Sequence, residues 1–357
     1  MTLTIRKVDP TKRKTIPTDD AKLGFGQSFS DHMFTMKYER EKGWFDPVIE
    51  PYHPIALDPA AMVLHYGQEV FEGLKAYRGK DGGLYLFRYQ DNLKRFNRSC
   101  QRMVIPELDL EQVGEALRKL VVLEKDWIPK SQGCALYIRP NVIATDAALG
   151  VRPANQYLFY IIVGPVGAYY PEGFNPVSIY VSDKYVRACR GGIGEAKTAA
   201  NYAASLRGQM EAKEKGFSQV LWLDAVERKY VEEVGTMNIF FQFGDEVVTS
   251  PLTGSILPGI TRDSVRVRLK KWGVKVTERL FSMEEVLAAF KSGKLKEVFG
   301  TGTAAIISPV KLIHYRGENL EVGDGKTGPI AQKLYDYLLA LQYGHEKDPF
   351  GWVERID

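Results

Sequence analysis

A Gly- and Pro-rich stretch near the middle of the chain, GPVGAYYPEG at residues 164–173, separates two segments that are both rich in strand-forming residues. Clusters of glycine and proline between such segments are typical of turns and linkers. A chain of 357 residues is also too long for one ordinary hydrophobic core. We therefore predict a mixed α/β fold with two domains: a small N-terminal α/β domain at residues 1–163, an interdomain loop at 164–174, and a large C-terminal domain at 175–357.

Strand and helix patterns alternate in both halves of the chain. Runs of β-branched and aromatic residues predict strands at residues 135–140, 157–163 and 177–181. Apolar residues at helical spacing predict helices at residues 110–126 and 203–216. These alternating patterns favour helices that pack on sheets in each domain.

Composition excludes several classes of function. Hydrophobic residues make up 45% of the chain and charged residues 26%, which is typical of a globular protein, and the net charge of +4 does not indicate a nucleic-acid surface. We expect no membrane partner, because no run of about 18 apolar residues occurs. The histidines show no metal-ligand spacing, so we predict no metal site. Cys100, Cys134 and Cys189 lie far apart, and the N-terminus lacks an organelle presequence, so we expect a cytoplasmic protein.

One lysine stands among small residues in the stretch GGIGEAKTAANY at residues 191–202. After Lys197 the next charged residue is Arg207. A lysine held in a small-residue pocket can lose solvation and act as an amine nucleophile, for example in a Schiff base with a carbonyl substrate or with pyridoxal phosphate. The alternative is an ordinary solvated surface lysine.

Three further features are candidates for binding a phosphate. Arg95 and Arg98 lie three residues apart on a predicted helix, where they form either a phosphate site or a solvated face. Residues 258–265 predict a turn that enters a helix, and residues 298–305 form a Gly-rich turn after a strand. The second turn matches the dinucleotide fingerprint formally, but the sequence IISP that follows it does not support the required helix.

Two adjacent glutamates, Glu232 and Glu233, lie in a predicted strand at residues 230–234. Strand alternation predicts that one of the two faces inward. A buried carboxylate needs a partner. A protonated pyridine nitrogen and an arginine are the two candidates for that partner.

The motifs that contain these residues resemble those of the branched-chain amino acid aminotransferases, which belong to the fold-type IV, class IV pyridoxal-phosphate-dependent aminotransferases. The resemblance runs from about Phe25 to the C-terminus. It is carried by the motifs HYGQEVFEGLKAY, LYIRP, EAKTAANYAASL, LWLDAVERKYVEEVGTMNIFF, GSILPGITRDSV and VFGTGTAAIISPV. The resemblance implies a two-domain fold with pyridoxal 5'-phosphate at the domain interface.

The resemblance also implies a set of roles for cofactor binding. Lys197 is implied as the Schiff-base lysine and the catalytic proton shuttle. Tyr202 is expected to hydrogen-bond the phenolate oxygen of the cofactor, and Glu233 to pair with its pyridine nitrogen. The remaining cofactor residues are those expected to hold the phosphate: Arg95, Ile260, Thr261 and Thr303.

A second set of residues is implied as the substrate site. Phe71 and Tyr137, together with Tyr66 and Val151 from the neighbouring subunit, resemble the hydrophobic lining. Thr236, together with the turn at Thr303 and Ala304, resembles the α-carboxylate site of the family. Arg139 is expected to meet the side-chain carboxylate of glutamate.

The implied activity is the reversible, ping-pong transamination of L-leucine, L-isoleucine and L-valine with 2-oxoglutarate by a homodimer. Its partners are therefore small amino acids and 2-oxo acids. A D-amino acid transaminase and an aminodeoxychorismate lyase of the same fold are the alternatives, and the EVGTMN and YIR motifs argue against both. A non-enzymatic protein would require loss of a catalytic residue, but Lys197, Tyr202 and Glu233 are all present. Ala305 and Ser308 stand where some animal members carry a redox CxxC, so we predict no thiol switch of that kind.

Overall fold

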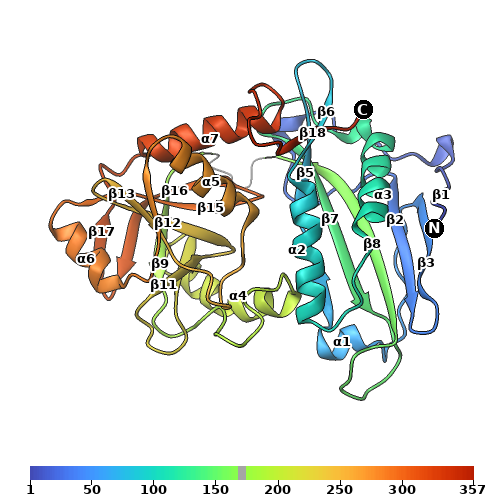
Figure 1. The fold of residues 1–357 in the computed structure, drawn as a ribbon, viewed down its shortest axis with the longest axis horizontal. Helices are drawn as coiled ribbons and strands as arrows, with labels where there is room; N and C mark the ends of the chain where they lie inside the picture. Colours follow the sequence, from blue (N-terminus) through green and yellow to red (C-terminus); the bar gives the residue numbers. More distant parts are fainter. Residues whose placement is uncertain (168–173) are drawn as a thin grey trace. The chain divides into compact units, whose positions relative to one another are not determined.

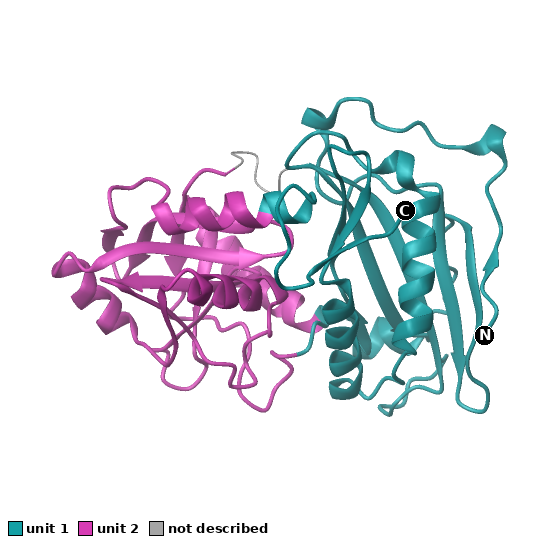
Figure 2. Cartoon of the chain, turned by 45° about the horizontal axis from the view of Figure 1, so that its top comes forward, with its two compact units in different colours: residues 1–169, 196–199, 339–357 teal, residues 170–195, 200–338 magenta. Residues whose placement is uncertain are grey.

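A computed structural model describes residues 1–167 and 174–357 of the chain (Figure 1). It groups the chain into two compact units, shown in different colours in Figure 2: unit 1 holds residues 1–169, 196–199 and 339–357, and unit 2 holds residues 170–195 and 200–338. Most of the predicted interdomain loop, residues 168–173, lies outside the described residues, so its role stays a prediction.

The described strands of unit 1 form one nine-stranded sheet in the order β1-β3-β2-β8-β7-β5-β6-β18, and β4 pairs separately with β7. Its middle consists of long antiparallel partners that keep one register over seven residue pairs or more, β2 with β8 and β8 with β7. The bounds of these strands are β1 Thr4–Ile5, β2 His32–Glu39, β3 Gly43–Pro51, β4 Glu69–Phe71, β5 Leu74–Arg78, β6 Leu84–Phe87, β7 Ala135–Ala144, β8 Gln156–Val166 and β18 Val353–Arg355.

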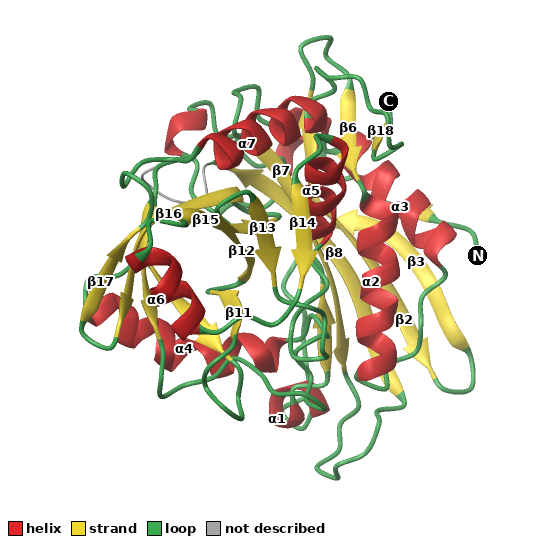
Figure 3. Cartoon of the chain, turned by 60° about the vertical axis from the view of Figure 1, so that its left-hand side comes forward, coloured by secondary structure: helices red, strands yellow, loops and turns green. Residues whose placement is uncertain are grey.

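One face of this sheet is covered by α2 (Tyr89–Arg102) and α3 (Leu110–Leu123), which lie side by side against it (Figure 3). The alternation of buried and half-buried side chains along β7 explains why the helices cover this face of the sheet. Leu136, Ile138 and Val142 are fully buried in the core with residues of both helices, whereas Tyr137, Arg139 and Asn141, which point the other way, are only half-buried. The short helix α1 (Met62–Tyr66) precedes β4. The opposite face of the sheet is therefore left for polar side chains.

Two short segments that follow unit 2 residues in sequence pack with unit 1, which differs from a division of the chain into two continuous domains. At the C-terminus, β18 pairs antiparallel with β6 and completes an edge of the sheet. At residues 196–199, backbone hydrogen bonds join the chain to β4, as described below. We predicted that the C-terminal domain, residues 175–357, carries Lys197; in the structure Lys197 groups with unit 1.

The strands of unit 2 close into a ring. The pairing order is β11-β10-β9-β16-β15-β12-β13-β14, and β11 also pairs with β12, so the path returns on itself. β17 adds to β16 outside this path. The bounds are β9 Val177–Val181, β10 Gln219–Leu223, β11 Val231–Val234, β12 Met237–Phe243, β13 Glu246–Thr249, β14 Lys275–Glu278, β15 Leu295–Gly302, β16 Ile306–Tyr315 and β17 Glu318–Glu321. Because β11 pairs with β10 on one side and β12 on the other, it has no free edge. All four of its residues are buried.

Four helices complete the fold: α4 (Ala199–Glu214), α5 (Ile260–Lys271), α6 (Met283–Lys291) and α7 (Pro329–Gln342). Apolar side chains of the strands, such as Ile239, Phe241 and Val298, form the core of unit 2 with Met283 and Val286 of α6. Among the described residues, none of the helices has the length and apolar character needed to cross a membrane.

The predicted elements named above are present, with differences at their ends. The strand predicted at residues 135–140 continues to Ala144, and the helix predicted at 203–216 begins earlier, at Ala199. The helix that contains Arg95 begins at Tyr89, after Arg88, which has a positive φ of 50°. The Gly-rich turn at residues 298–305 leads into β16 and not into a helix, so rejecting the dinucleotide fingerprint was correct.

Candidate active site

Three of the predicted substrate residues lie together on the open face of the unit 1 sheet. Phe71 ends β4, while Tyr137 and Arg139 lie two residues apart on β7 and so point to the same side. The Arg139 guanidinium lies 4.7 Å from the centroid of the Phe71 ring and 5.2 Å from that of Tyr137. Its Nη2 donates a 3.1 Å hydrogen bond to the Tyr137 hydroxyl. This aromatic–arginine cluster (Phe71, Tyr137 and Arg139) offers apolar surface and a positive charge together.

A glycine makes room for the cluster. A Cβ atom at Gly73 would lie 2.0 Å from the Tyr137 hydroxyl, so only glycine lets the tyrosine cross the backbone there. This is the physical reason for the glycine in the FEGLKAY motif.

The backbone around Lys197 is fixed to unit 1 by three hydrogen bonds. The amide of Phe71 donates to the Lys197 carbonyl at 3.0 Å, and the Lys197 amide donates to Oγ of Ser99 at 2.9 Å. The next residue, Thr198, is fully buried and donates a 2.6 Å hydrogen bond to the Glu69 carbonyl. Nζ of Lys197 lies 4.5 Å from the centroid of the Phe71 ring. The lysine amine is therefore held beside the aromatic–arginine cluster.

The carboxylate of Glu69, which the sequence analysis did not single out, lies in the same region. Oε2 accepts a 2.8 Å hydrogen bond from the amide of Ala199, the first residue of α4, and Oε1 accepts one of 2.8 Å from Nδ2 of Asn141. Burial raises the pKa of Glu69, although these hydrogen bonds and the charges of Arg139 and Lys197 oppose the shift. Glu69 thus joins β4, β7 and the Lys197 segment.

Arg95, predicted to hold a phosphate, forms a buried ion pair with Glu72. Nε and Nη2 of Arg95 donate to the two carboxylate oxygens at 2.6 Å and 2.9 Å. Asn92 and the amide of Gly73 also donate to Glu72, at 3.0 Å and 2.9 Å. Burial would raise the pKa of Glu72, but the Arg95 charge outweighs it and the pKa is lowered. The guanidinium is therefore rigidly oriented.

Arg98 does not share this environment. Arg95 is buried whereas Arg98 is exposed, so the interpretation of the two as a pair on one face was wrong. The helix turns the two side chains to different surroundings because only position 95 faces the Glu72 carboxylate.

Tyr66 and Val151, predicted to act in the neighbouring subunit, lie at the surface of unit 1. The Val151 side chain is 86% exposed and Tyr66 37%. The Tyr66 hydroxyl donates to the carbonyl of Leu149, which ties α1 to the loop that carries Val151. The two residues are therefore brought near one another within unit 1.

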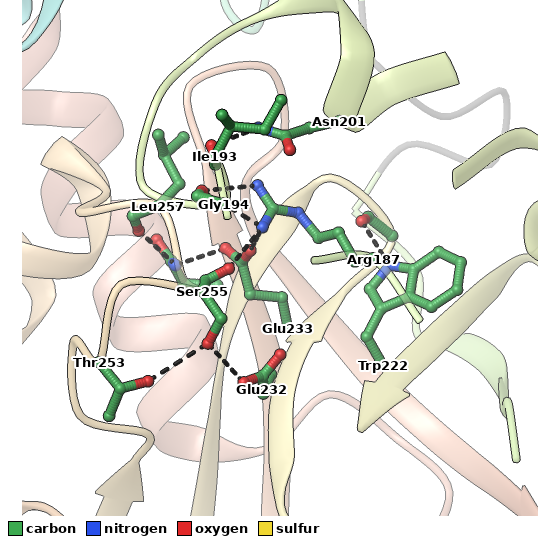
Figure 4. A network of polar contacts seen from close by, with 12 residues as sticks. Arg187, Ile193, Gly194, Asn201, Trp222, Glu232, Glu233, Thr253, Ser255 and Leu257 are labelled. Carbon is green, nitrogen blue, oxygen red and sulfur yellow. Dashed lines mark hydrogen bonds and ion pairs between the residues drawn. The ribbon is translucent and has the colours of Figure 1, made fainter. Parts of the chain in front are cut away.

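In unit 2, Glu233 is the centre of a buried polar network (Figure 4). Nδ2 of Asn238 donates a 2.8 Å hydrogen bond to Oε1 of Glu233 and one of 2.9 Å to the carbonyl of Leu257. Oε2 lies 2.7 Å from Nη1 of Arg187 as an ion pair but accepts no hydrogen bond of good geometry from any described residue. Burial raises the pKa of Glu233 to about 7, since the opposing charge of Arg187 is partly offset by Glu232.

Arg187 links this carboxylate to two loops. Its Nη1 donates to the Ser255 carbonyl at 2.9 Å, and its Nη2 donates to the Gly194 carbonyl at 3.3 Å. The hydroxyl of Ser255 donates a 2.5 Å hydrogen bond to Glu232. The expectation that only one of the two adjacent glutamates faces inward was therefore wrong: Glu232 is 8% exposed and Glu233 3%, because Ser255 contacts the first side chain and Arg187 the second.

Ile260 and Thr261 form the first turn of α5, after Gly259 at the N-cap. Both side chains are buried. A Cβ atom at Gly259 would lie 2.0 Å from Oδ1 of Asn238, so glycine is needed for Asn238 to reach Glu233. The N-terminus of a twelve-residue helix carries a favourable dipole for an anion. The close approach of Gly259 to Asn238 thus links the predicted phosphate-binding turn to Glu233, the predicted partner of the ring nitrogen.

Thr303 and Ala304 lie in the turn between β15 and β16. The turn ends at Ile306, which has a φ of +63°. That conformation is strained for a β-branched residue and is characteristic of functional turns. Thr301, just before the turn, lies in one row with Asn238 and Glu233 across β15, β12 and β11.

Tyr202 and Thr236 border one small pocket of unit 2, together with Arg187, Asn201 and Ser205. Asn201 donates a 2.8 Å hydrogen bond to the carbonyl of Ile193 and so fixes the loop before the lysine to the start of α4. The predicted residues of unit 2 are thus grouped around Arg187 and Glu233.

The residues present fit pyridoxal phosphate. Two buried polar atoms in the Glu233 row, Oε2 of Glu233 and Oγ1 of Thr301, have no hydrogen-bond partner among the described residues. A buried carboxylate oxygen in that state suits a donor such as a protonated pyridine nitrogen. Lys197 supplies an amine, and a helix N-terminus and a strained turn supply anion-binding backbone.

Sequence reasoning missed the residues that hold the others in place: Glu69, Glu72, Arg187 and Asn238. Glu72 and Asn238 stand within motifs that were noted, FEGLKAY and VGTMNIFF, yet Glu72 pairs with Arg95, 23 residues away, and Asn238 joins Glu233 to Leu257, which lies 19 residues beyond it. A buried charged residue within an apolar motif is the only signal that was available.

Comparison with known proteins agrees with this arrangement. The family model for amino-transferase class IV matches residues 69–313. The branched-chain-amino-acid aminotransferase 2 of Bacillus subtilis (strain 168) is 53% identical over 356 residues, which cover 100% of this chain and 98% of the relative. The branched-chain-amino-acid transaminase 1 of the same organism is 55% identical over 339 residues, 95% of each chain.

A solved structure is similar as well. A branched-chain amino acid aminotransferase from Escherichia coli superposes with a TM-score of 0.73 at 27% identity, over 92% of this chain and 99% of that one. The structural similarity therefore extends through both units. The family match at residues 69–313 spans the predicted site residues from Phe71 to Ala304.

Proposed function

The chain belongs to the class IV amino-transferase family, and we propose that it exchanges the amino group between L-leucine, L-isoleucine or L-valine and 2-oxoglutarate, with pyridoxal phosphate as cofactor. The products are the branched-chain 2-oxo acids and L-glutamate, formed in two half-reactions. The names of the two Bacillus subtilis relatives support this substrate class, and neither favours the D-amino acid or lyase alternative.

Pyridoxal phosphate, when bound, supplies an electron sink for the negative charge that develops at the substrate α-carbon. Lys197 would hold the cofactor and move the proton at that carbon, because its amine is half-buried and fixed over the Phe71 ring. Oε2 of Glu233 would accept the hydrogen bond of a protonated ring nitrogen. Tyr202 would donate to the phenolate oxygen.

Four residues are proposed for the phosphate group. Arg95 is held in one orientation by Glu72, and Ile260 and Thr261 stand at the N-terminus of α5. Thr303 adds a hydroxyl in the strained turn. Fixed donors of this kind favour a dianion without reorganisation of the site.

The substrate side is proposed from the remaining residues. The rings of Phe71 and Tyr137 would receive a branched side chain, and Arg139 would receive the side-chain carboxylate of glutamate. Thr236 and Ala304 are the proposed α-carboxylate partners. The two half-reactions would then use the same surface, one for an aliphatic side chain and the other for an acidic one.

We further propose a homodimer, because Tyr66 and Val151 are exposed apolar residues that suit a contribution to the neighbour's site. A cytoplasmic location is proposed from the cysteines. Cys100, Cys134 and Cys189 are all free thiols, which suits a reducing compartment.

The observation that carries the proposed function is the aromatic–arginine cluster beside Lys197. It combines an amine, apolar rings and one guanidinium within a single unit. An enzyme that alternates between an aliphatic and an acidic amino acid needs these three elements together.

The test is the visible absorption of the purified, cofactor-loaded protein. L-Leucine is expected to remove the yellow band of the bound cofactor, and 2-oxoglutarate is expected to restore it. Lys197→Ala should abolish turnover. A yellow protein that is indifferent to L-leucine but responds to D-alanine would refute the proposed substrate class.

A further inference from the structure

Glu69 and Arg139 lie on the same surface of unit 1. β4 and β7 pair antiparallel with Phe71 opposite Asn141, so Glu69 and Phe71 share a face with Arg139 and Asn141. Glu69 contacts Asn141 through a 2.8 Å hydrogen bond, and the Arg139 guanidinium lies 4.7 Å from the Phe71 ring centroid. The carboxylate and the guanidinium therefore lie on the same face, on either side of the row formed by Phe71 and Asn141.

The Glu69 carboxylate and the Arg139 guanidinium are both shielded from bulk water, so their charges interact more strongly than at an open surface. Glu69 is 7% exposed, and Arg139 is half-buried between two aromatic rings. The charges of Arg139 and Lys197 both act on the Glu69 carboxylate and favour its ionised form. Charges in partly desolvated surroundings interact far more strongly than at an open surface.

The proposed reaction sets two opposite demands on this patch. An aliphatic side chain that covers Arg139 removes water from a cation without replacing its hydrogen bonds, which is unfavourable. A glutamate side chain instead brings its own negative charge. With an uncompensated guanidinium the surface would favour the acidic substrate strongly, so a fixed counter-charge is needed to balance the two.

We propose that Glu69 is a specificity-determining residue that supplies this counter-charge and thereby lets one surface accept both aliphatic and acidic side chains. The inference rests on the proposed function and on the role proposed there for Arg139. Glu69 also holds the amide of Ala199, so its loss affects the Lys197 segment as well. That second effect acts on every substrate alike and leaves the ratio between substrates unchanged.

The test measures binding of two simple acids to the cofactor-loaded protein by calorimetry at pH 8. 4-Methylvaleric acid carries a branched apolar end, and glutaric acid carries a second carboxylate. In Glu69→Gln the affinity for glutaric acid should rise relative to that for 4-methylvaleric acid by about tenfold, because the positive charge of Arg139 is no longer offset. The ratio of kcat/KM for L-glutamate over L-leucine should shift in the same direction.

Two matched variants separate charge from structure. Glu69→Asp keeps the charge but shortens the side chain, so affinities fall while the ratio stays within about twofold of wild type. Asn141→Ala removes the 2.8 Å hydrogen bond to Glu69 without changing any charge and should also preserve the ratio.

The inference is overturned if Glu69→Gln leaves the ratio unchanged, or if Asn141→Ala shifts it as much as Glu69→Gln does. Failure of the proposed function looks different. A wild-type protein that binds glutaric acid but neither binds 4-methylvaleric acid nor turns over L-leucine refutes the branched-chain assignment. In that case the affinity of Glu69→Gln for glutaric acid, expected to be higher than that of wild type, still decides whether Glu69 opposes the charge of Arg139.

Discussion

Replacing Gly259 by alanine tests whether Asn238 is held in place by the close approach of the α5 N-cap. A Cβ atom there would lie 2.0 Å from Oδ1 of Asn238, so the amide must move by about 1 Å or more to reach van der Waals contact. That movement breaks the hydrogen bonds of Asn238 to Glu233 and to Leu257, now 2.8 Å and 2.9 Å.

The cost follows from these two bonds. A hydrogen bond to a charged group contributes about 1.5–3 kcal/mol to stability, and a neutral one about 1 kcal/mol. Alanine at position 259 offsets roughly 0.5 kcal/mol by restricting the unfolded chain, since its φ of −67° suits any residue. We expect Gly259→Ala to lower the free energy of unfolding by about 2–3 kcal/mol.

The assay is urea unfolding of the cofactor-free protein in a double-mutant cycle. In an Asn238→Ala background the new methyl group no longer meets Oδ1, so the loss from Gly259→Ala should nearly vanish. Gly150→Ala is the matched control, because a Cβ atom there meets nothing within 4 Å, so only the restriction of the unfolded chain remains and stability should rise by about 0.5 kcal/mol. An equal loss from Gly259→Ala in both backgrounds would refute the reasoning.

Three further outcomes are expected. Glu72→Gln leaves Arg95 buried without its counter-charge and should cost about 3–5 kcal/mol in urea unfolding, whereas Glu115→Gln, in an exposed pair with Lys119, should leave the unfolding midpoint unchanged; equal losses would contradict this. Thr198→Val keeps the shape but removes the 2.6 Å hydrogen bond to the buried Glu69 carbonyl, so we expect a loss of about 1–2 kcal/mol and slower turnover of L-leucine, and unchanged values would argue against it. Burial raises the pKa of Glu233 from 4.5 to about 7, so the folded cofactor-free protein holds a proton that the unfolded chain releases. Its stability should therefore fall as pH rises from about 4.5 to 7, by roughly 3 kcal/mol, and Glu233→Gln should flatten that slope in unfolding curves taken across the range.

Local patterns predicted the elements because each depends on nearby residues. The β-branched and aromatic residues at 135–140 predicted the strand, and the small residues around Lys197 marked a lysine that is held by backbone contacts. The glycine at position 73 was visible as a break, but the tyrosine it accommodates was not, because Tyr137 is brought there by the sheet.

Long-range closure accounts for what the sequence did not reveal. The alternation rule failed at Glu232 and Glu233, since residues distant in sequence cover both faces of β11: the Ser255 hydroxyl contacts Glu232, and Arg187 contacts Glu233. The partner of Glu72 lies 23 residues away on a helix, and Arg98, three residues beyond that partner, is exposed. No pattern within a few residues distinguishes a buried arginine from a solvated one when only the tertiary fold supplies the carboxylate.

The charges around Glu233 also explain why two carboxylates stand side by side there. If Arg187 faced Glu233 alone, the two would neutralise one another and leave no preference for a further cation. Glu232 adds a second buried negative charge, held by the Ser255 hydroxyl, and this contributes to the raised pKa of Glu233. Burial and Glu232 together thus favour a proton on Glu233 in the cofactor-free protein, and a protonated pyridine nitrogen would take the place of that proton on binding. On this argument, Glu232→Gln should weaken pyridoxal phosphate binding even though Glu232 need not touch the cofactor.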